Sequence, residues 1–231
     1  QAHPQVAGVQ NEGCFVLIRL CCRAFLEAGL ARRQRAAEAG AIEAVVDAMR
    51  AHLIEGGAEE DDERSASFQH DCCWALRLMC YGDDAAALAR KQRATVAHAI
   101  AAVVEAMRAH PHAANLQIEG CKALTYICNG PGTTGQSRKQ LALGAGALGV
   151  VVGAMQLHAH EEELQEPGCN ALLSMCRDSG GEAVATVRAR RERAAQAGGR
   201  TVAVAALQAH ADFGRVYELA GEVLDLLPVL A

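Results

Sequence analysis

The chain has 231 residues, of which 51% are hydrophobic but only 3% are aromatic, and alanine accounts for much of the difference. This composition favours helices that pack closely together, so we expect no sheet. The net charge is −5 at pH 7, so the chain as a whole is not attracted to nucleic acid or to anionic lipid. No apolar run approaches the roughly 20 residues of a membrane-spanning helix, and we expect no transmembrane segment.

The first predicted helix covers residues 10–22. A basic helix start follows at residues 32–36, and then comes a turn at Gly40. An amphipathic helix is predicted next from apolar residues at i, i+3, i+4 and i+7, and it ends at His52. Its apolar stripe is Ile42, Val45, Val46 and Met49.

These features recur along the chain at matching intervals. The basic start returns at residues 90–94, 138–142 and 190–194. The steps from Arg32 to Arg90, Arg138 and Arg190 are 58, 48 and 52 residues. The amphipathic helix and the histidine that ends it recur with the same three steps. The histidines are His52, His110, His158 and His210. The last copy of the helix is less apolar, with Arg200, Ala203, Val204 and Leu207 at the stripe positions. A shared period of this size indicates a repeat array.

A third helix in each copy carries two cysteines seven residues apart. The pairs are Cys14/Cys21, Cys73/Cys80, Cys121/Cys128 and Cys169/Cys176. They lie on an apolar stripe, where free cysteine acts as a small hydrophobe. The two sulfurs are about 10 Å apart along a helix, too far for a disulfide or a shared zinc ion. We interpret Cys22 and Cys72, which lie outside these pairs, as surface or packing thiols. Because the cysteines are expected to be free, we expect the protein in a reducing intracellular compartment, most readily the cytoplasm, with an organelle interior as the alternative.

The spaces between the repeated helices are predicted from turn residues and charge. Residues 53–67, which include five successive acidic residues at 59–63, are predicted to form a solvated loop. Residues 129–136 and 177–186 are predicted turns. A final helix is expected over residues 216–227, and it leaves an apolar end at residues 226–230.

The order of a short helix, a glycine turn, a second helix and a long helix resembles the armadillo repeat. Residues 92–110, 115–128 and 140–155 carry this resemblance, together with the turns at Gly40, Gly146 and Gly198, where His98 replaces glycine in the second copy. The resemblance implies an all-α fold, a right-handed armadillo-type α-solenoid of about four repeats plus a preceding third helix. A single domain would comprise a partial repeat at 1–22 and repeats at 23–81, 82–129, 130–177 and 178–231.

The resemblance also implies a concave groove, lined by the third helices, that receives a segment of another protein. Many armadillo proteins carry an asparagine near the end of that helix and a tryptophan four residues earlier. The asparagine positions here hold Arg19, Leu78, Tyr126 and Ser174. Without the asparagines, the resemblance does not extend to recognition of nuclear-import signals. The predicted protein-binding residues are Phe15, Arg19, His70, Trp74, Lys122, Tyr126, Asn170 and Ser174; for Trp74 and Phe15, packing between third helices is the alternative.

Other motifs point to chemistry that we reject at this stage. Residues 144–149 and 130–137 resemble nucleotide-binding loops, but a helix precedes the first and Gln136 replaces the lysine of the second. The four histidines belong to layers about 10 Å apart, so we expect them to cap helix C-termini rather than share a metal. Serine, aspartate and glutamate are scattered without a nucleophile setting. We therefore expect no catalysis, metal, cofactor or small-molecule substrate.

The leading hypothesis is a non-catalytic scaffold that binds protein in its groove and docks through one or both ends. One alternative is a permanent structural subunit of a large assembly, perhaps membrane-associated. Another alternative is nucleic-acid binding along an arginine-rich ridge. No aromatic residues that could stack on bases are interleaved with the arginines. We therefore favour the interpretation that these arginines are solvated and cover apolar surface with their side chains. The ridge comprises Arg32, Arg33, Arg35, Arg90, Lys91, Arg93, Arg190, Arg191 and Arg193.

Overall fold

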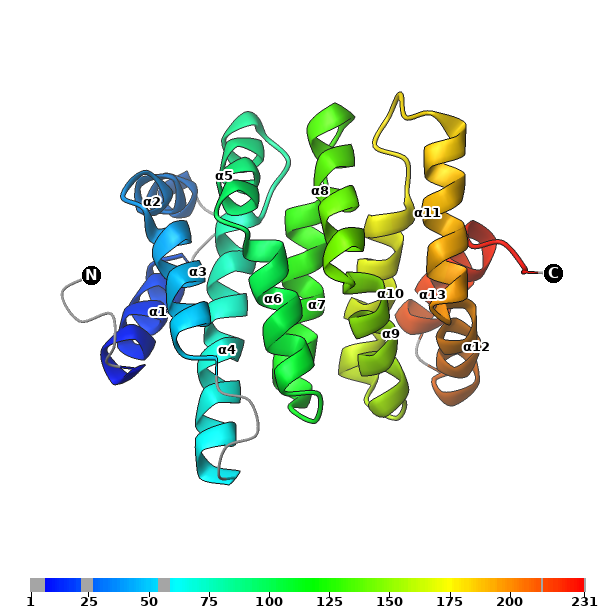
Figure 1. Cartoon of the computed structure of the whole chain (residues 1–231), viewed down its shortest axis with the longest axis horizontal. Coiled ribbons are helices and arrows are strands. Elements are labelled where there is room, and N and C mark those ends of the chain that lie inside the picture. The colour runs from blue at the N-terminus through cyan, green and yellow to red at the C-terminus, as the bar shows by residue number, and fades with distance from the viewer. Residues whose placement is uncertain (1–6, 22–26, 54–58, 213, 231) are drawn as a thin grey trace. The chain divides into compact units, whose positions relative to one another are not determined.

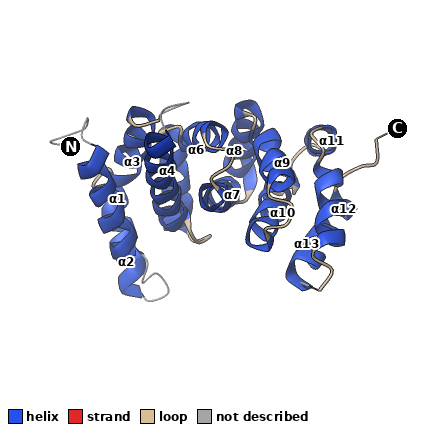
Figure 2. Cartoon of the chain, turned by 90° about the horizontal axis from the view of Figure 1, so that it is seen from below, coloured by secondary structure: helices blue, strands red, loops and turns tan. Residues whose placement is uncertain are grey.

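The computed structural model describes residues 7–21, 27–53, 59–212 and 214–230. Within these ranges the chain forms thirteen helices and no strand, which confirms the all-α prediction (Figure 2). No single described helix is long and apolar enough to cross a membrane; only the pair Gly132–Ala145 and Ala147–Leu157 reaches that length, across a 64° bend. The chain divides into two compact units, Gln1–Ile127 and Cys128–Ala231.

The first unit is built from seven helices among its described residues, and the last of them ends at the boundary (Figure 1). α1 packs on α4, and α3 packs on both α4 and α6. The helices are α1 (Ala7–Cys21), α2 (Glu27–Glu38), α3 (Ala41–Ala51), α4 (Glu59–Cys80), α5 (Ala85–Val96), α6 (Ala99–Ala109) and α7 (Ala114–Cys128).

The second unit contains six described helices. α10 packs against both α9 and α13, and α12 packs against α13. The helices are α8 (Gly132–Ala145), α9 (Ala147–Leu157), α10 (Glu162–Cys176), α11 (Val184–Gln196), α12 (Gly199–Ala209) and α13 (Gly214–Leu226).

The middle helices α3, α6, α9 and α12 are copies of one another in length and in both ends. Each has 11 residues and is C-capped by one of the four repeated histidines, as expected. Each also follows a residue in the left-handed region: Gly40, His98, Gly146 or Gly198, with φ of 85°, 60°, 83° and 96°. His98 is the one non-glycine residue with positive φ in the described part of the chain. The predicted turn therefore forms even where glycine is replaced, at some backbone strain.

The cores of both units contain the predicted apolar stripes. Ile42, Val45, Val46 and Met49 are buried, as are the corresponding residues of α6 and α9. The last copy differs from its prediction: Val202, Ala203 and Ala206 are buried, whereas Val204 is 42% exposed. The buried face of α12 therefore lies about one residue earlier than predicted. Its side chains are smaller than those of the other copies, so its apolar stripe is less sharply defined by the sequence.

Seven of the eight ladder cysteines lie in the core as free thiols, as expected, and Cys72 is buried with them. The side chain of Cys21, the eighth, is not among those described, and Cys22 lies outside the described residues. Burial of these small polarisable side chains on the third helices accounts for the regular cysteine spacing.

Three predicted loops are partly helical instead. The acidic residues 59–63 begin α4, because Asp62 accepts a 2.8 Å hydrogen bond from the buried ring of His110 and Arg64 pairs with Asp61. Negative charge is also favourable at a helix N-terminus. Residues 132–136 begin α8, after the extended residue Pro131. Residues 184–186 begin α11. Charge and glycine content therefore predicted where the connections between helices lie, but not the residues at which the following helices begin.

Candidate protein-binding surface

The third helices α1, α4 and α7 position six of the eight predicted binding residues in the first unit. The other two, Asn170 and Ser174, lie on α10 in the second unit, where both are half-buried. In every helix the two predicted residues are four apart, so they project from the same face on successive turns. Each helix is considered in turn below.

On α1, Phe15 and Arg19 form an exposed pair. Phe15 is 45% exposed, and the Arg19 guanidinium lies 5.6 Å from the centre of its ring. Such a cation–π contact orders both side chains while leaving them accessible. This exposure favours the surface interpretation of Phe15 over packing between third helices.

On α4, the indole of Trp74 is half-buried and pairs with the ring of His70. The ring centres are 5.9 Å apart with an interplanar angle of 62°, an edge-to-face arrangement. The Nδ1 atom of His70 lies 3.0 Å from Asp71 Oδ1. The indole Nε1 of Trp74 is covered and has no hydrogen-bond acceptor among the described residues. Trp74 is thus partly packed and partly open.

On α7, Lys122 and Tyr126 are each half-buried and engaged with other side chains. Lys122 donates to Glu119, which is only 7% exposed and also lies 2.8 Å from the guanidinium of Arg77 on α4. The ring of Tyr126 lies 5.2 Å from that of Tyr81. Burial, and then the nearby Tyr81, raise the pKa of the Tyr126 hydroxyl, so it stays a neutral donor and acceptor at neutral pH. The buried carboxylate of Glu119 links α4 to α7 beneath this surface.

Four of the nine side chains of the arginine ridge are buried, which corrects the interpretation of these four as solvated side chains. Arg33, Arg90, Lys91 and Arg190 are each at most 2% exposed. Arg90 donates to the main-chain oxygen of Met79 at 2.6 Å, at the C-terminal end of α4. Cations at this end of a helix satisfy its free carbonyls and its dipole. Buried side chains bound in this way cannot contact phosphates of a nucleic acid.

The same capping role recurs in the second unit. Arg138 donates to the oxygen of Asn129 at 3.1 Å, and Lys139 donates to that of Arg177 at 2.6 Å. Burial, and then the charge of Arg190, lower the pKa of the Lys139 ammonium. The basic helix starts are therefore helix caps, a role that their sequence pattern alone did not reveal.

The histidine ladder connects neighbouring repeats, as well as occupying the C-caps. His210 Nε2 lies 2.9 Å from the oxygen of Ala159, next to the C-cap of α9. His110 Nε2 lies 3.0 Å from the hydroxyl of Ser65 on α4, and its Nδ1 bonds Asp62. His210 thus reaches the end of the preceding middle helix, and His110 reaches the start of the preceding third helix, α4. Sequence analysis placed both histidines only at their own helix ends.

Ser65, His110 and Asp62 form a hydrogen-bonded chain in the order used by serine hydrolases, so the description of such residues as scattered was wrong. Geometry alone does not give such a chain catalytic power, because a substrate must reach the hydroxyl. Ser65 is only 4% exposed, and its hydroxyl also lies 3.3 Å from the main-chain oxygen of His52. The chain of hydrogen bonds joins the start of α4 to the end of α6.

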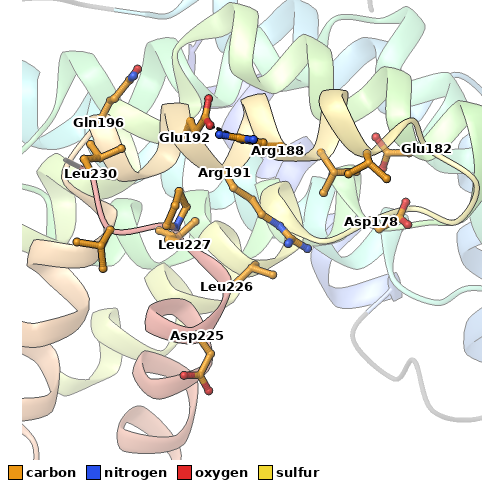
Figure 3. A pocket seen from close by; sticks show the side chains of 14 residues that line it. Asp178, Glu182, Arg188, Arg191, Glu192, Gln196, Asp225, Leu226, Leu227 and Leu230 are labelled. Atoms are coloured by element: carbon orange, nitrogen blue, oxygen red, sulfur yellow. Dashed lines mark hydrogen bonds and ion pairs between the residues drawn. The ribbon is translucent and has the colours of Figure 1, made fainter.

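A pocket of about 740 Å³ opens in the second unit between α11 and the segment that follows α13 (Figure 3). Its apolar side is formed by Val184, Val187 and residues 226–230. Figure 3 shows Arg191 extending from α11 toward Leu226, and Arg188 paired with Glu192 at 2.8 Å. The predicted apolar end lines this pocket: Leu227 is buried, but Val229 and Leu230 are 79% and 44% exposed.

No family model, curated protein or solved structure matches this chain.

Proposed function

We propose that this chain is a non-enzymatic scaffold of the armadillo type, a right-handed α-solenoid, that binds a segment of another protein along α1, α4 and α7. It works in a reducing intracellular compartment, with the cytoplasm as the first choice. The repeated three-helix unit supports this proposal, since all four middle helices share one length, one left-handed entry residue and one histidine cap.

One observation carries the binding role: aromatic and basic side chains stand together, partly exposed, on successive turns of the third helices. Phe15 with Arg19, His70 with Trp74, and Lys122 with Tyr126 are each one turn apart. Protein interfaces concentrate their binding energy in tryptophan, tyrosine and arginine that are already held in place. Here ring contacts hold five of these six side chains in place before any partner arrives.

Trp74 gives a direct test, because it is the only tryptophan in the chain. Peptides selected from a random display library against the immobilised protein are titrated while the fluorescence of Trp74 is recorded. We expect saturable changes, and at least tenfold weaker binding for Phe15→Ala and Tyr126→Ala. Val96→Ala on α5 is the matched control, because Val96 is 69% exposed and lies away from these pairs in sequence. Equal affinity of all three variants, or peptides that leave Trp74 unchanged, would reject the proposal.

Docking through the end of the second unit is a further part of the proposal, and it also accommodates the alternative of a permanent subunit. The exposed Val229 and Leu230 beside the pocket of α11 favour it, since exposed apolar side chains that cluster on a surface mark sites of protein contact. The molar mass of the isolated protein tests this idea by light scattering. Self-association that Val229→Asp and Leu230→Asp abolish supports a docking end. A wild-type chain that is strictly monomeric, with the same molar mass as these two variants, counts against it.

A further inference from the structure

Two cysteines from different helices of the first unit lie side by side. The Sγ atoms of Cys14 on α1 and Cys72 on α4 are 3.5 Å apart, although the residues are 58 apart in the chain. Both are buried, at 3% and 0% exposure. A disulfide needs about 2.05 Å between its sulfurs, so side-chain rotation with a small shift of the helices would close the gap.

The pair arises from a departure from the repeat pattern. Cys14 occupies the same ladder position as Cys73, Cys121 and Cys169. Cys72 occupies a position where the other third helices have Gly13, Gly120 and Gly168. This repeat therefore carries one additional thiol, and it lies against the ladder thiol of α1.

The local chemistry distinguishes the two thiols. The hydrogen bond from Cys72 lowers the pKa of Cys14, against the opposing effect of its burial. Burial is the main cause that raises the pKa of Cys72. A thiolate is the reactive form of cysteine toward oxidants, and a neighbouring thiol can then resolve the oxidised sulfur. Because both thiols are buried, peroxide reaches them only when α1 moves away from α4. Of the two, Cys14 is then suited to react first and Cys72 second.

We propose that Cys14 and Cys72 form a reversible disulfide that ties α1 to α4 when the protein meets a peroxide. The Cys14 thiolate attacks one oxygen of hydrogen peroxide, the O–O bond breaks, and a sulfenic acid and hydroxide form. The sulfur of Cys72 then attacks the sulfenic sulfur and displaces hydroxide, which takes the proton of the Cys72 thiol and leaves as water, and the disulfide has formed. The hydroxide of the first step takes up the proton that the Cys14 thiol had released and becomes the second water. In sum, two thiols are oxidised and one peroxide is reduced to two waters.

The disulfide would fix two parts of the proposed binding surface. Cys14 precedes Phe15 on α1, and Cys72 lies two residues before Trp74 on α4. Oxidation therefore joins the backbones that carry these two aromatic side chains, and thiol reductants release them. This regulatory role rests on the proposed function, whereas formation of the disulfide does not, so the two can fail separately.

The experiment uses the full chain, first reduced and then exposed to hydrogen peroxide under native conditions. Remaining thiols are blocked with N-ethylmaleimide, and the protein is digested with trypsin without reduction. We expect one main cross-linked species, between residues 1–19 and 65–77, that dithiothreitol removes. Because Cys72 and Cys73 share a tryptic peptide, two variants separate them: Cys73→Ala should keep the cross-link, and Cys72→Gly, which restores the residue of the other repeats, should lose it.

A second measurement guards against loss of folding in the variants. Amide hydrogen exchange of the oxidised wild-type chain should slow in α1 at least tenfold and recover after reduction. The proposal is overturned if Cys14 accumulates as sulfinic acid without a cross-link, if Cys72→Gly keeps the cross-link, or if exchange in α1 is unchanged by a disulfide that has formed.

Discussion

The side-chain amide of Gln117 on α7 donates a 2.8 Å hydrogen bond to the main-chain oxygen of Met107 on α6, and the same nitrogen lies 2.9 Å from the oxygen of His110. Gln165 repeats both contacts with Met155 and His158, and Gln69 repeats the first with Met49. The last carbonyls of a helix have no partner within it. In three of the four repeats, one buried glutamine therefore closes the middle helix and joins it to the third.

Replacing Gln117 with leucine should destabilise the first unit by about 1–3 kcal/mol, because buried carbonyl groups lose their donor while the volume of the side chain is nearly kept. Gln117 is 1% exposed. Urea unfolding, followed by circular dichroism, measures the free energy of unfolding. Gln92→Leu on the exposed face of α5 is the control and should change it little. A loss as small as that of the control would show that the carbonyls find other donors.

Gly120 and Gly153 are both helical glycines, yet we expect opposite effects of alanine. A Cβ on Gly120 would lie 2.5 Å from the sulfur of the buried Met107, whereas a Cβ on Gly153 meets nothing within 4 Å. Overpacking against Met107 should cost about 1–3 kcal/mol. Gly153→Ala should stabilise α9 by up to about 1 kcal/mol, since alanine restricts the unfolded chain and favours helix.

Thermal unfolding of both glycine variants, with the wild type in the same buffer, gives the comparison. A stabilised Gly120→Ala protein would mean that Met107 adopts another rotamer at little cost. A destabilised Gly153→Ala protein would mean that α9 is covered on the side that the structure shows as open.

The ion pair of Glu182 and Arg190 predicts acid sensitivity in the second unit. Their side chains are 1% and 2% exposed, and the atoms lie 2.7 Å apart. The hydrogen bond from Arg190 is the main cause that lowers the pKa of Glu182 from 4.5 to about 2. A carboxyl with a depressed pKa stabilises the folded state above its unfolded pKa, and this contribution is lost as pH falls from about 4.5 toward 2.

Glu182→Gln should therefore lower the melting temperature at pH 7 and flatten its decline between pH 4.5 and 2. Differential scanning calorimetry across this range, on both proteins, provides the measurement. Glu163→Gln is the control, because Glu163 is exposed in the first turn of α10. Parallel curves for the wild type and Glu182→Gln would refute a stabilising role for this pair.

Much of the helical plan was predictable because repetition multiplies weak signals. Four copies of the stripe at Ile42, Val45, Val46 and Met49, each followed by a histidine and three of them preceded by a glycine, predicted all four middle helices and three of their stripes correctly. The start of α4 was not predictable from composition: Asp62 is held in the helix by His110, 48 residues away. Such a contact leaves no local trace in the sequence.

The candidate surface was predictable only in part. Spacing gave the face of Phe15, Arg19, Trp74 and Tyr126, and the structure shows which of these are open. The arginines were misjudged, since the sequence gives charge but not burial, and Arg90 lies under the C-terminal end of α4. Gln69, Gln117 and Gln165 each lie four residues before a ladder cysteine. Their role emerges only when the carbonyls they contact are known.

The ladder thiols of the second unit should resist alkylation while the protein is folded. Burial raises the pKa of Cys169 to about 12 and that of Cys176 to about 11. At pH 8 only about one Cys169 side chain in ten thousand is then ionised, and the thiolate is the form that reacts with iodoacetamide. We expect labelling of these two residues at a rate set by unfolding, at least a hundredfold slower than in 8 M urea. Mass spectrometry of timed digests measures it, and Cys14, whose pKa is lowered, should react sooner. Rapid labelling of Cys169 in native buffer would show that α10 opens to solvent without global unfolding, and the core assigned to this helix would then be wrong.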